Sequence, residues 1–293
     1  MKKKSNGFPE NTNDKLGFTF HRSFPLNRRA INEILNIIVD RPILESEKEQ
    51  ISLKEIRSKS QLGTIYVDSM PRWAFGTGLI GQNKLLLSFG NYAFKNDPLL
   101  ELLDTQWLMH YFISTSNGPG PLFWHELIKT HFRSGNEFSI HDLTEQIRDI
   151  YFKTEGKDLS YRSARTTATV FIGTYTKSES FGKLGIIECF DENHYRVLHP
   201  DPPSAWGIGF ALLDYWKRNY SELATIKLES LFVDGGFANL FLLGTGHLNI
   251  FLRELQSIGY LEVYRVVPPY QIILLQKDSE QLFERIYGQK TSY

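Results

Sequence analysis

Cysteine is almost absent from this chain of 293 residues: only Cys189 is present, so no disulfide can form within the chain. Cys189 lies in the apolar run 185–190, where no neighbouring residue in the sequence would activate a thiol. We therefore expect it to be a small buried hydrophobe in a strand and not a nucleophile. A chain without disulfides suits the reducing cytoplasm, where we expect this protein to be.

Long apolar runs are also missing. No segment approaches eighteen uncharged apolar residues, so no membrane span is predicted. The basic residues 2–4 are followed by polar residues instead of the apolar stretch of a signal peptide. We expect residues 1–16, which are polar and rich in Lys, Asn and Asp, to form a disordered tail.

The sequence has no excess of either charge, since Lys and Arg together number 33 and Asp and Glu also number 33. The net charge therefore gives no support for nucleic-acid binding. It does not exclude such binding, because phosphate contacts require positive charge only on the contacting face. Hydrophobic residues make up 41% and aromatic residues 14%, enough to fill the cores of the two or three compact units that this length predicts.

Dense catalytic motifs are absent as well. His125, Glu126 and His131 resemble a zinc-protease signature, but the position four residues after His125 is Lys129, so the required pair of histidines is missing. The glycine-rich segments at 173, 235–236 and 244–246 lack the Lys-Ser/Thr pair of a phosphate-binding loop. Nucleotide binding is therefore not predicted.

What the chain does contain is a repeated order of helix, turn, helix and hairpin. Before the first copy, apolar spacing predicts a helix from Arg28 that ends before Pro42. The first copy then has a short helix capped by Ser52 and a second helix that apolar residues mark from Val67 and that closes near Gly76. Because Pro71 would kink a helix at this position, the alternative is that the second helix starts close to it. Short strands are predicted after it, at 79–80, 84–88 and 92–94.

Two further copies follow the same order. The second has helices predicted at 139–150 and 160–175 and a hairpin of 184–188 with 194–198. The third has a short helix at 227–232, a longer one at 248–258 and a hairpin of 260–264 with 271–275. Each copy enters its hairpin at a glycine, which suits a left-handed junction: Gly78, Gly185 and Gly259.

These patterns predict an α+β fold that is mostly helical, with repeated winged-helix-like units and a central helical hairpin. The aromatic stretch 98–131 is broken at 116–121, which folds two helices back on each other, and the proline-rich segment 199–203 is the best domain boundary. The predicted organisation is a tail (1–16), an N-terminal winged-helix-like unit (17–97), the helical hairpin with a second unit (98–199), and a C-terminal unit (204–293) that a helix over 206–219 opens.

Three separated segments carry a family resemblance. They are His21-Arg22-Ser23-Phe24-Pro25-Leu26, then Leu62-Gly63 with Arg72-Trp73 and Gly78-Leu79-Ile80, and the segment 97–110, DPLLELLDTQWLMH. In this order they resemble the signature of a bacterial family named as domain of unknown function four thousand and seven, and the resemblance is best over residues 17–150. Where its pattern leads us to expect an arginine, this chain has Asn27, with Arg28 and Arg29 beside it.

The family includes the SspB-like component of DNA phosphorothioation systems, which replace a non-bridging phosphate oxygen of DNA by sulfur and act in antiviral defence. The resemblance implies binding and nicking of duplex DNA in partnership with a cysteine desulfurase, an ATP-pyrophosphatase-like enzyme and an ATPase. A nickase (endonuclease) of this kind would use Mg²⁺ or Mn²⁺, and the sequence does not identify the metal ligands.

Candidate catalytic residues are scattered: Asp104, His110 and His21. Asp104 and His110 lie on one predicted helix but nearly two turns apart, each next to Trp107. The simpler interpretation is that Asp104 caps this helix and that His110 packs beside Trp107 with a satisfied ring nitrogen. A catalytic role for either remains the alternative.

Candidate DNA contacts are the basic residues of the predicted second helices and wings: Arg72, Lys84, Arg162, Arg165, Lys177, His247, Arg253 and Arg265. The segment Arg162 to Thr167 is the best of them, because two cations alternate with small hydroxyl residues. Two other functions stay open: a non-catalytic winged-helix scaffold that binds partner proteins, and a transcription regulator.

Overall fold

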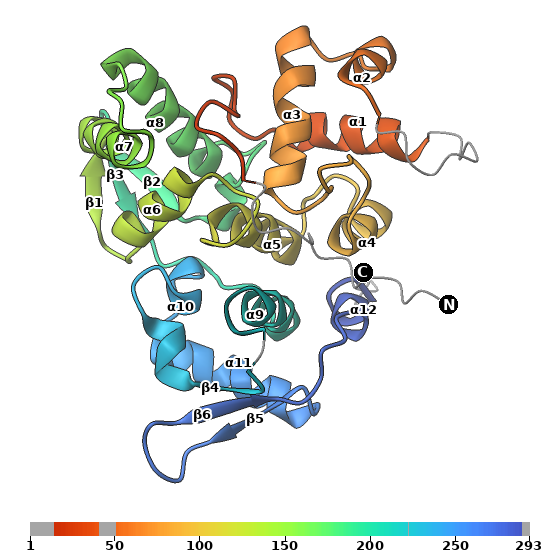
Figure 1. Ribbon diagram of the computed structural model, residues 1–293, viewed down its shortest axis with the longest axis vertical. Coiled ribbons are helices and arrows are strands. Elements are labelled where there is room, and N and C mark those ends of the chain that lie inside the picture. Colours follow the sequence, from red (N-terminus) through yellow and green to blue (C-terminus); the bar gives the residue numbers. More distant parts are fainter. Residues whose placement is uncertain (1–14, 41–50, 222, 289–293) are drawn as a thin grey trace.

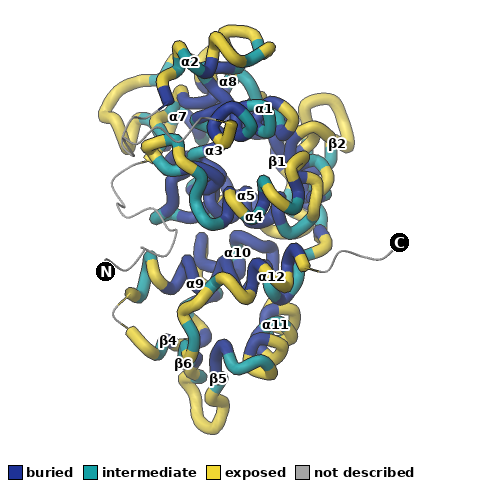
Figure 2. The backbone as a smooth tube through the Cα atoms, turned by 90° about the vertical axis from the view of Figure 1, so that its right-hand side faces the viewer, coloured by how far each residue is buried: buried dark blue, intermediate teal, exposed yellow. Residues whose placement is uncertain are grey.

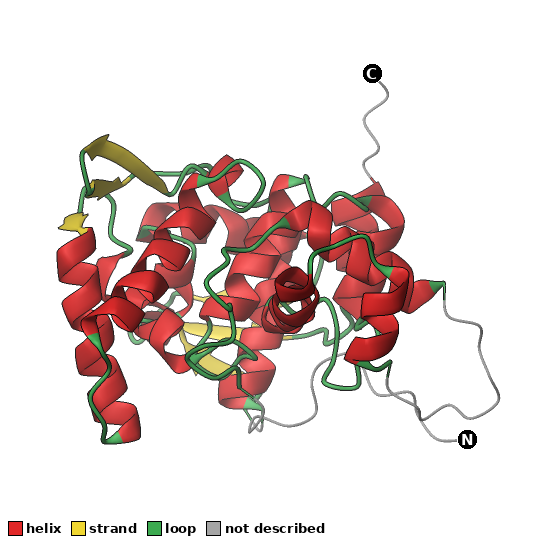
Figure 3. Cartoon of the chain, turned by 90° about the horizontal axis from the view of Figure 1, so that it is seen from above, coloured by secondary structure: helices red, strands yellow, loops and turns green. Residues whose placement is uncertain are grey.

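The computed structural model describes residues 15–40, 51–221 and 223–288. The chain is an α+β protein made mostly of helices, as predicted, and its strands are short and gathered in two small antiparallel sheets (Figure 1, Figure 3). All but the last two residues of the predicted tail 1–16 lie outside the described residues. None of the helices in the described ranges has the length and apolar character needed to cross a bilayer.

Among its described residues, the N-terminal part has the helices α1 (Arg28–Val39), α2 (Leu53–Lys59), α3 (Thr64–Gly76) and α4 (Ser88–Asn96). Ser52 caps α2 through its side chain, as predicted. The alternative in which the second helix starts near Pro71 is wrong, because α3 begins at Thr64 and includes Pro71.

The hairpin predicted after α3 is also wrong. Residues 79–88 form only an isolated bridge between Ile80 and Leu86, and the last predicted strand is part of α4. The helix places Phe89 and Ala93 one turn apart, and both are buried. It also brings Gly90 against the Leu79 backbone, where a Cβ would lie 1.9 Å from the carbonyl oxygen. The pattern of residues 84–94 that predicted strands therefore belongs to the start of α4, whose buried residues lie on one side of the helix.

The central part contains the two helices of the predicted helical hairpin, α5 (Leu103–Ser114) and α6 (Leu122–His131), which contact each other. It continues with β1 (Glu137–Ser139), α7 (Ile140–Glu155), α8 (Tyr161–Thr176), a 3-10 turn η1 (Gly182–Leu184), β2 (Ile187–Asp191) and β3 (His194–Val197). The sheet order is β1-β3-β2 and both pairs are antiparallel. The predicted helix pair and hairpin are confirmed here.

The C-terminal part repeats this order. It consists of α9 (Ala205–Tyr220), β4 (Thr225–Lys227), the 3-10 turn η2 (Leu228–Phe232), α10 (Phe237–Leu240), α11 (Thr245–Ser257), β5 (Leu261–Tyr264), β6 (Gln271–Leu274) and α12 (Glu280–Gly288). Its sheet has the order β4-β6-β5, again antiparallel. Both sheets therefore pair the strand before the helices with the second strand of the hairpin.

The glycine junctions adopt the predicted left-handed conformation, with φ of 74° at Gly78, 64° at Gly185 and 75° at Gly259. Only the second and third open a hairpin, since the chain after Gly78 goes on to α4.

The core runs through the middle of the molecule, where α5 is buried on nearly all sides from Thr105 to Ser114 (Figure 2). The last helix, α12, packs on α9 and also on α4 from the N-terminal part. Its Phe283 ring lies 4.7 Å from Tyr92 of α4 and 4.4 Å from Phe210 of α9, measured between ring centroids. The C-terminal helix therefore joins elements that are far apart in the sequence.

Candidate nucleic-acid interface

Helix α8 has one buried and one solvent-facing side. Ser160 caps it, because its side chain accepts a hydrogen bond from the Ser163 amide, and the buried side packs against α7 and β2. On the other side Arg162 and Thr169 are exposed, and Arg165 and Thr166 are half-buried. Their spacing of three and four residues places these four side chains in one stripe along the helix. Thr169, which sequence reasoning missed, completes the stripe.

The stripe is positive. Helix α8 contains Arg162 and Arg165 and has no Asp or Glu from Tyr161 to Thr176. Neighbouring α7, by contrast, carries acidic residues along its length, including Asp142 and Glu145. The charged side chains that α8 itself carries are therefore all positive, although the charge of the whole chain is balanced.

The hydroxyl groups of the stripe are already engaged. Thr166 and Thr169 donate to the carbonyl oxygens of Arg162 and Arg165, each at 2.9 Å. Ser163 Oγ accepts a hydrogen bond from Ser160 Oγ at 2.9 Å, so its own proton is not used in that bond. The donors best placed for phosphate are thus the two guanidinium groups and the Ser163 hydroxyl.

The hairpin β2–β3 beside α8 is less suited to DNA. Its turn carries Asp191 and Glu192, both exposed. Arg196 of β3 is held between two carboxylates, at 2.7 Å from Glu137 and 3.4 Å from Glu188. The candidate DNA contacts of this unit therefore lie on α8, with exposed Lys177 at its C-terminal end.

Cys189 lies in this hairpin, and the expectation that it is buried is wrong. Its side chain is exposed, and Sγ lies 3.2 Å from the Asp191 carbonyl oxygen. The apolar run that suggested burial ends in a strand whose last residues, from Cys189 onward, face solvent.

The other candidate DNA contacts are spread over the molecule. Lys84 is half-buried and donates to the Ile51 carbonyl at 2.9 Å, which ties a loop to the start of α2, and Arg72 is half-buried on α3. On α11 and its hairpin, His247, Arg253 and Arg265 are exposed. Arg265 donates to Asn249 Oδ1 at 2.7 Å, and the His247 ring lies 5.4 Å from the ring of His199.

The three candidate catalytic residues are not brought into one site. His110 is completely buried, with Nδ1 at 2.9 Å from the Tyr175 hydroxyl and Nε2 at 2.8 Å from the Leu240 carbonyl. Its ring lies edge-on to Trp107, as the simpler interpretation predicts. Burial lowers the pKa of His110 to about 4, so the imidazole is neutral near pH 7.

Asp104 and His21 also have structural partners. Asp104 does not cap its own helix, which corrects that expectation: Oδ1 accepts the Ser204 amide at 2.7 Å, at the start of α9. Burial raises the pKa of Asp104. His21 is buried, and its ring nitrogens lie 3.3 Å from Thr167 Oγ1 and 3.0 Å from the Ser23 amide. Burial lowers the pKa of His21 to about 4.

A resident metal ion would need a group of ligands. Within residues 15–40, 51–221 and 223–288, no three or more His, Cys, Asp and Glu side chains gather closely enough to hold one. The protein part of a Mg²⁺ or Mn²⁺ site is therefore not formed by such a cluster in the described chain.

The chain is thus a mostly helical α+β protein. Its central and C-terminal units both have the order helix, strand, helix pair and hairpin, and the central unit contains the basic helix α8. The chain belongs to the family described as protein of unknown function (DUF4007), whose model matches residues 52–287. The match extends through the C-terminal unit, well beyond the region 17–150 in which the motifs are clearest. A comparison with curated proteins finds no match.

Two solved structures have a similar fold. The magnesium ion-bound SspB crystal structure has a TM-score of 0.74 at 16% sequence identity, over 97% of this chain and 92% of that one. A second SspB crystal structure has a TM-score of 0.72 at 17% identity, over 94% of this chain and 89% of that one. The resemblance inferred from the sequence is thereby confirmed, and at this identity the structural similarity is one of fold.

Proposed function

We propose that this protein binds duplex DNA through α8, as a component of a bacterial DNA phosphorothioation and anti-phage defence system. The observation that carries this proposal is the stripe of α8, which presents Arg162 and Arg165 to solvent without an acidic residue on the helix. The membership of the family and the SspB-like fold support the system in which the protein acts.

The element order supports the same helix. The element order α6-β1-α7-α8-β2-β3, with the sheet order β1-β3-β2, is the order expected of a winged helix, and we propose that the central unit acts as one. In helix-turn-helix proteins the second helix of the pair enters the major groove. That helix is α8 here. The C-terminal unit has the same order, but its α11 exposes one cation, Arg253, and one carboxylate, Glu254, so the exposed Arg and Glu side chains of that helix cancel in charge.

The test removes the cations of the stripe. We expect Arg162→Ala/Arg165→Ala to weaken duplex binding and to reduce the slope of log affinity against log salt by roughly 1.8, since each neutralised phosphate contributes about 0.9. Fluorescence anisotropy of a labelled duplex at several salt concentrations measures both quantities. Arg29→Ala, an exposed arginine on α1, is the matched control.

Arg253→Ala distinguishes the two units. Loss of binding in that variant with full binding in the double variant would place the interface on α11 and overturn the assignment to α8. Circular dichroism spectra that match the wild type show that a loss is not caused by unfolding.

The resemblance also implies that the protein nicks DNA. The candidate catalytic residues for nicking are Asp104, His110 and His21. The burial of the two histidines and the structural hydrogen bonds of all three residues favour positioning roles, and we propose binding without a metal-dependent step. We therefore expect supercoiled plasmid with Mg²⁺ or Mn²⁺ to stay closed. Relaxed circles that disappear with Asp104→Asn would contradict this and restore a catalytic site at α5.

Partners of the system follow from the same resemblance. We infer an assembly with its cysteine desulfurase, its ATP-pyrophosphatase-like enzyme or its ATPase, which co-purification after joint expression tests. A non-catalytic scaffold that binds partner proteins is the alternative to DNA binding. The salt titration separates the two, because a scaffold would show no salt-dependent affinity for the duplex.

A further inference from the structure

The sheet β4-β6-β5 covers one end of the molecule, with α11 and α9 on its inner side (Figure 1). Ile226, Leu261 and Ile272 point inward and are buried. Because side chains alternate along a strand, the residues between them point outward. The register places Thr225 next to Ile273 and Glu262 in one row, and Lys227 next to Gln271 and Tyr264 in the next.

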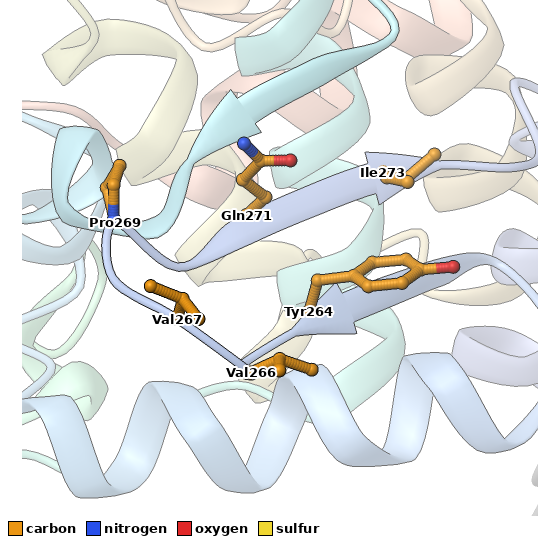
Figure 4. A pocket seen from close by; sticks show the side chains of 6 residues that line it. All are labelled: Tyr264, Val266, Val267, Pro269, Gln271 and Ile273. Atoms are coloured by element: carbon orange, nitrogen blue, oxygen red, sulfur yellow. The ribbon is translucent and has the colours of Figure 1, made fainter.

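On this outer face the central strand β6 presents Ile273 and Gln271, and the face is hollowed near the hairpin tip. Tyr264, Gln271 and Ile273 line the hollow together with Val266, Val267 and Pro269 of the connecting loop (Figure 4). Its volume is about 270 Å³. The hollow is therefore large enough to take side chains of the size of valine from a second molecule.

The hairpin tip exposes two large apolar side chains over most of their surface. Val266 is 88% and Val267 is 72% exposed, the highest fractions among the large hydrophobic side chains of the described residues. The segment 266–276 has no charged residue. A contiguous apolar patch of this kind typically marks an interaction site. A nucleic-acid partner would need cations along this segment, which it lacks.

We infer that the outer face of β4-β6-β5 is where two copies of this chain associate. Val266 and Val267 are walls of the hollow, so the same residues of a second copy packed against it would bury both sets of valines, the self-contact that a two-fold interface requires. The charges agree with this. Lys227 lies on the edge strand β4 and Glu262 on the opposite edge strand β5. When two such faces pack about a two-fold axis along the strands, β4 of each copy faces β5 of the other. Lys227 then lies opposite Tyr264 of the second copy and diagonally from its Glu262, one row or about 7 Å along the strand, which a lysine side chain can span.

The first experiment measures association of the full chain by sedimentation velocity from roughly 1 μM to 1 mM, which spans weak and moderate interfaces. We expect a concentration-dependent monomer–dimer equilibrium that is lost in Val266→Asp/Val267→Asp. Ile65→Asp, which places the same charge on an exposed hydrophobe of α3, is the control and leaves the equilibrium unchanged. A chain that stays monomeric over the whole range overturns the inference.

The second experiment identifies the face by exchanging charges. Lys227→Glu and Glu262→Lys should each raise the dissociation constant of the dimer by about tenfold, because each creates a like-charge contact across the interface. The double variant should restore most of the affinity. A dimer that is unaffected by the single variants, or a double variant that is weaker than both, means that the copies meet elsewhere.

Discussion

At the scale of single residues, the interior of this protein depends on histidines that are kept neutral. Burial is the main cause of the lowered pKa at His21, His110, His125 and His131. Each has a hydrogen-bond partner for its ring, so none is an orphan polar group. The histidines that suggested catalysis in the sequence therefore stabilise the packing of helices.

These histidines predict acid sensitivity. The folded state disfavours the imidazolium, while an unfolded histidine takes up a proton near its ordinary pKa of 6.5. Stability is therefore full above pH 6.5 and is lost as the pH falls toward 4. For His21 and His110, with a pKa of about 4, the loss is about 2 kcal/mol each at pH 5. Urea unfolding at pH 7 and pH 5 measures it.

The variant that tests this is His110→Gln, which should reduce the pH dependence because it removes one of the buried imidazoles. Equal free energies of unfolding at pH 7 and pH 5 in the wild type would contradict the prediction.

Arg28 directly follows Asn27, the position where the family pattern leads us to expect an arginine. It is buried, and its guanidinium donates to the carbonyl oxygens of Ser180 at 2.9 Å, Leu100 at 3.0 Å and Ser178 at 2.6 Å. Arg28→Lys loses the planar fork, and we expect the free energy of unfolding to fall by roughly 2 kcal/mol. Thermal and urea unfolding measure this, with the exposed Arg29→Lys expected to stay within about 0.5 kcal/mol of the wild type.

At the scale of elements, the glycine junctions share a backbone conformation but not an environment. A Cβ on Gly78 would lie 2.4 Å from Cδ2 of Phe112, while a Cβ on Gly185 would have no heavy atom within 4 Å. We expect Gly185→Ala to cost about 1 kcal/mol for the left-handed conformation alone. Gly78→Ala adds overpacking and should cost about 3 kcal/mol in total. Similar values for the two variants in urea unfolding would mean that Phe112 moves aside freely.

The sequence predicted most elements because their signals are local. Caps such as Ser139 and Ser160, apolar spacing, and turns such as 192–193 depend on neighbouring residues and mark the helices and the two hairpins correctly. Helix α4 was missed because its helical state depends on distant packing, with Phe89 against Phe112 and Phe283. No local pattern in 84–94 reports those contacts.

The candidate site was predicted only in part for the same reason. Arg162 and Arg165 were identified from a dense local pattern that a helix turns into one stripe. The burial of His110 and His21 depends on Tyr175, Leu240 and Thr167, which lie 65 to 146 residues away in the chain. Sequence spacing cannot distinguish a buried histidine of this kind from a catalytic one.

At the scale of the whole molecule, α12 links the predicted N-terminal and C-terminal units. Phe283 is buried against α4 and α9, and Tyr287 lies 3.1 Å from Thr105 of α5, hydroxyl to hydroxyl. The segment 199–203, predicted as a boundary, is held to α5 by the Trp107 indole, which donates to the Asp201 carbonyl at 2.9 Å. These contacts join the C-terminal unit to the rest of the described chain, so the units should unfold together.

We therefore expect a single cooperative unfolding transition across the predicted boundary. Tryptophan fluorescence and far-ultraviolet circular dichroism should give the same midpoint in urea. Phe283→Ala should lower the free energy of unfolding by about 3 to 4 kcal/mol and keep one transition. Two separated transitions in the wild type would show that the C-terminal unit folds on its own.

The tryptophan contacts have a consequence for how this family can diverge. Trp73, Trp107 and Trp216 donate to the main-chain carbonyls of Phe24, Asp201 and Leu223. An amide carbonyl is present whatever side chain the residue bears, so the acceptor positions can mutate while the bond is retained. Substitution is then restricted mainly at the tryptophan that donates the bond. Bonds of this kind are one physical reason why two chains can share a fold at 16% sequence identity.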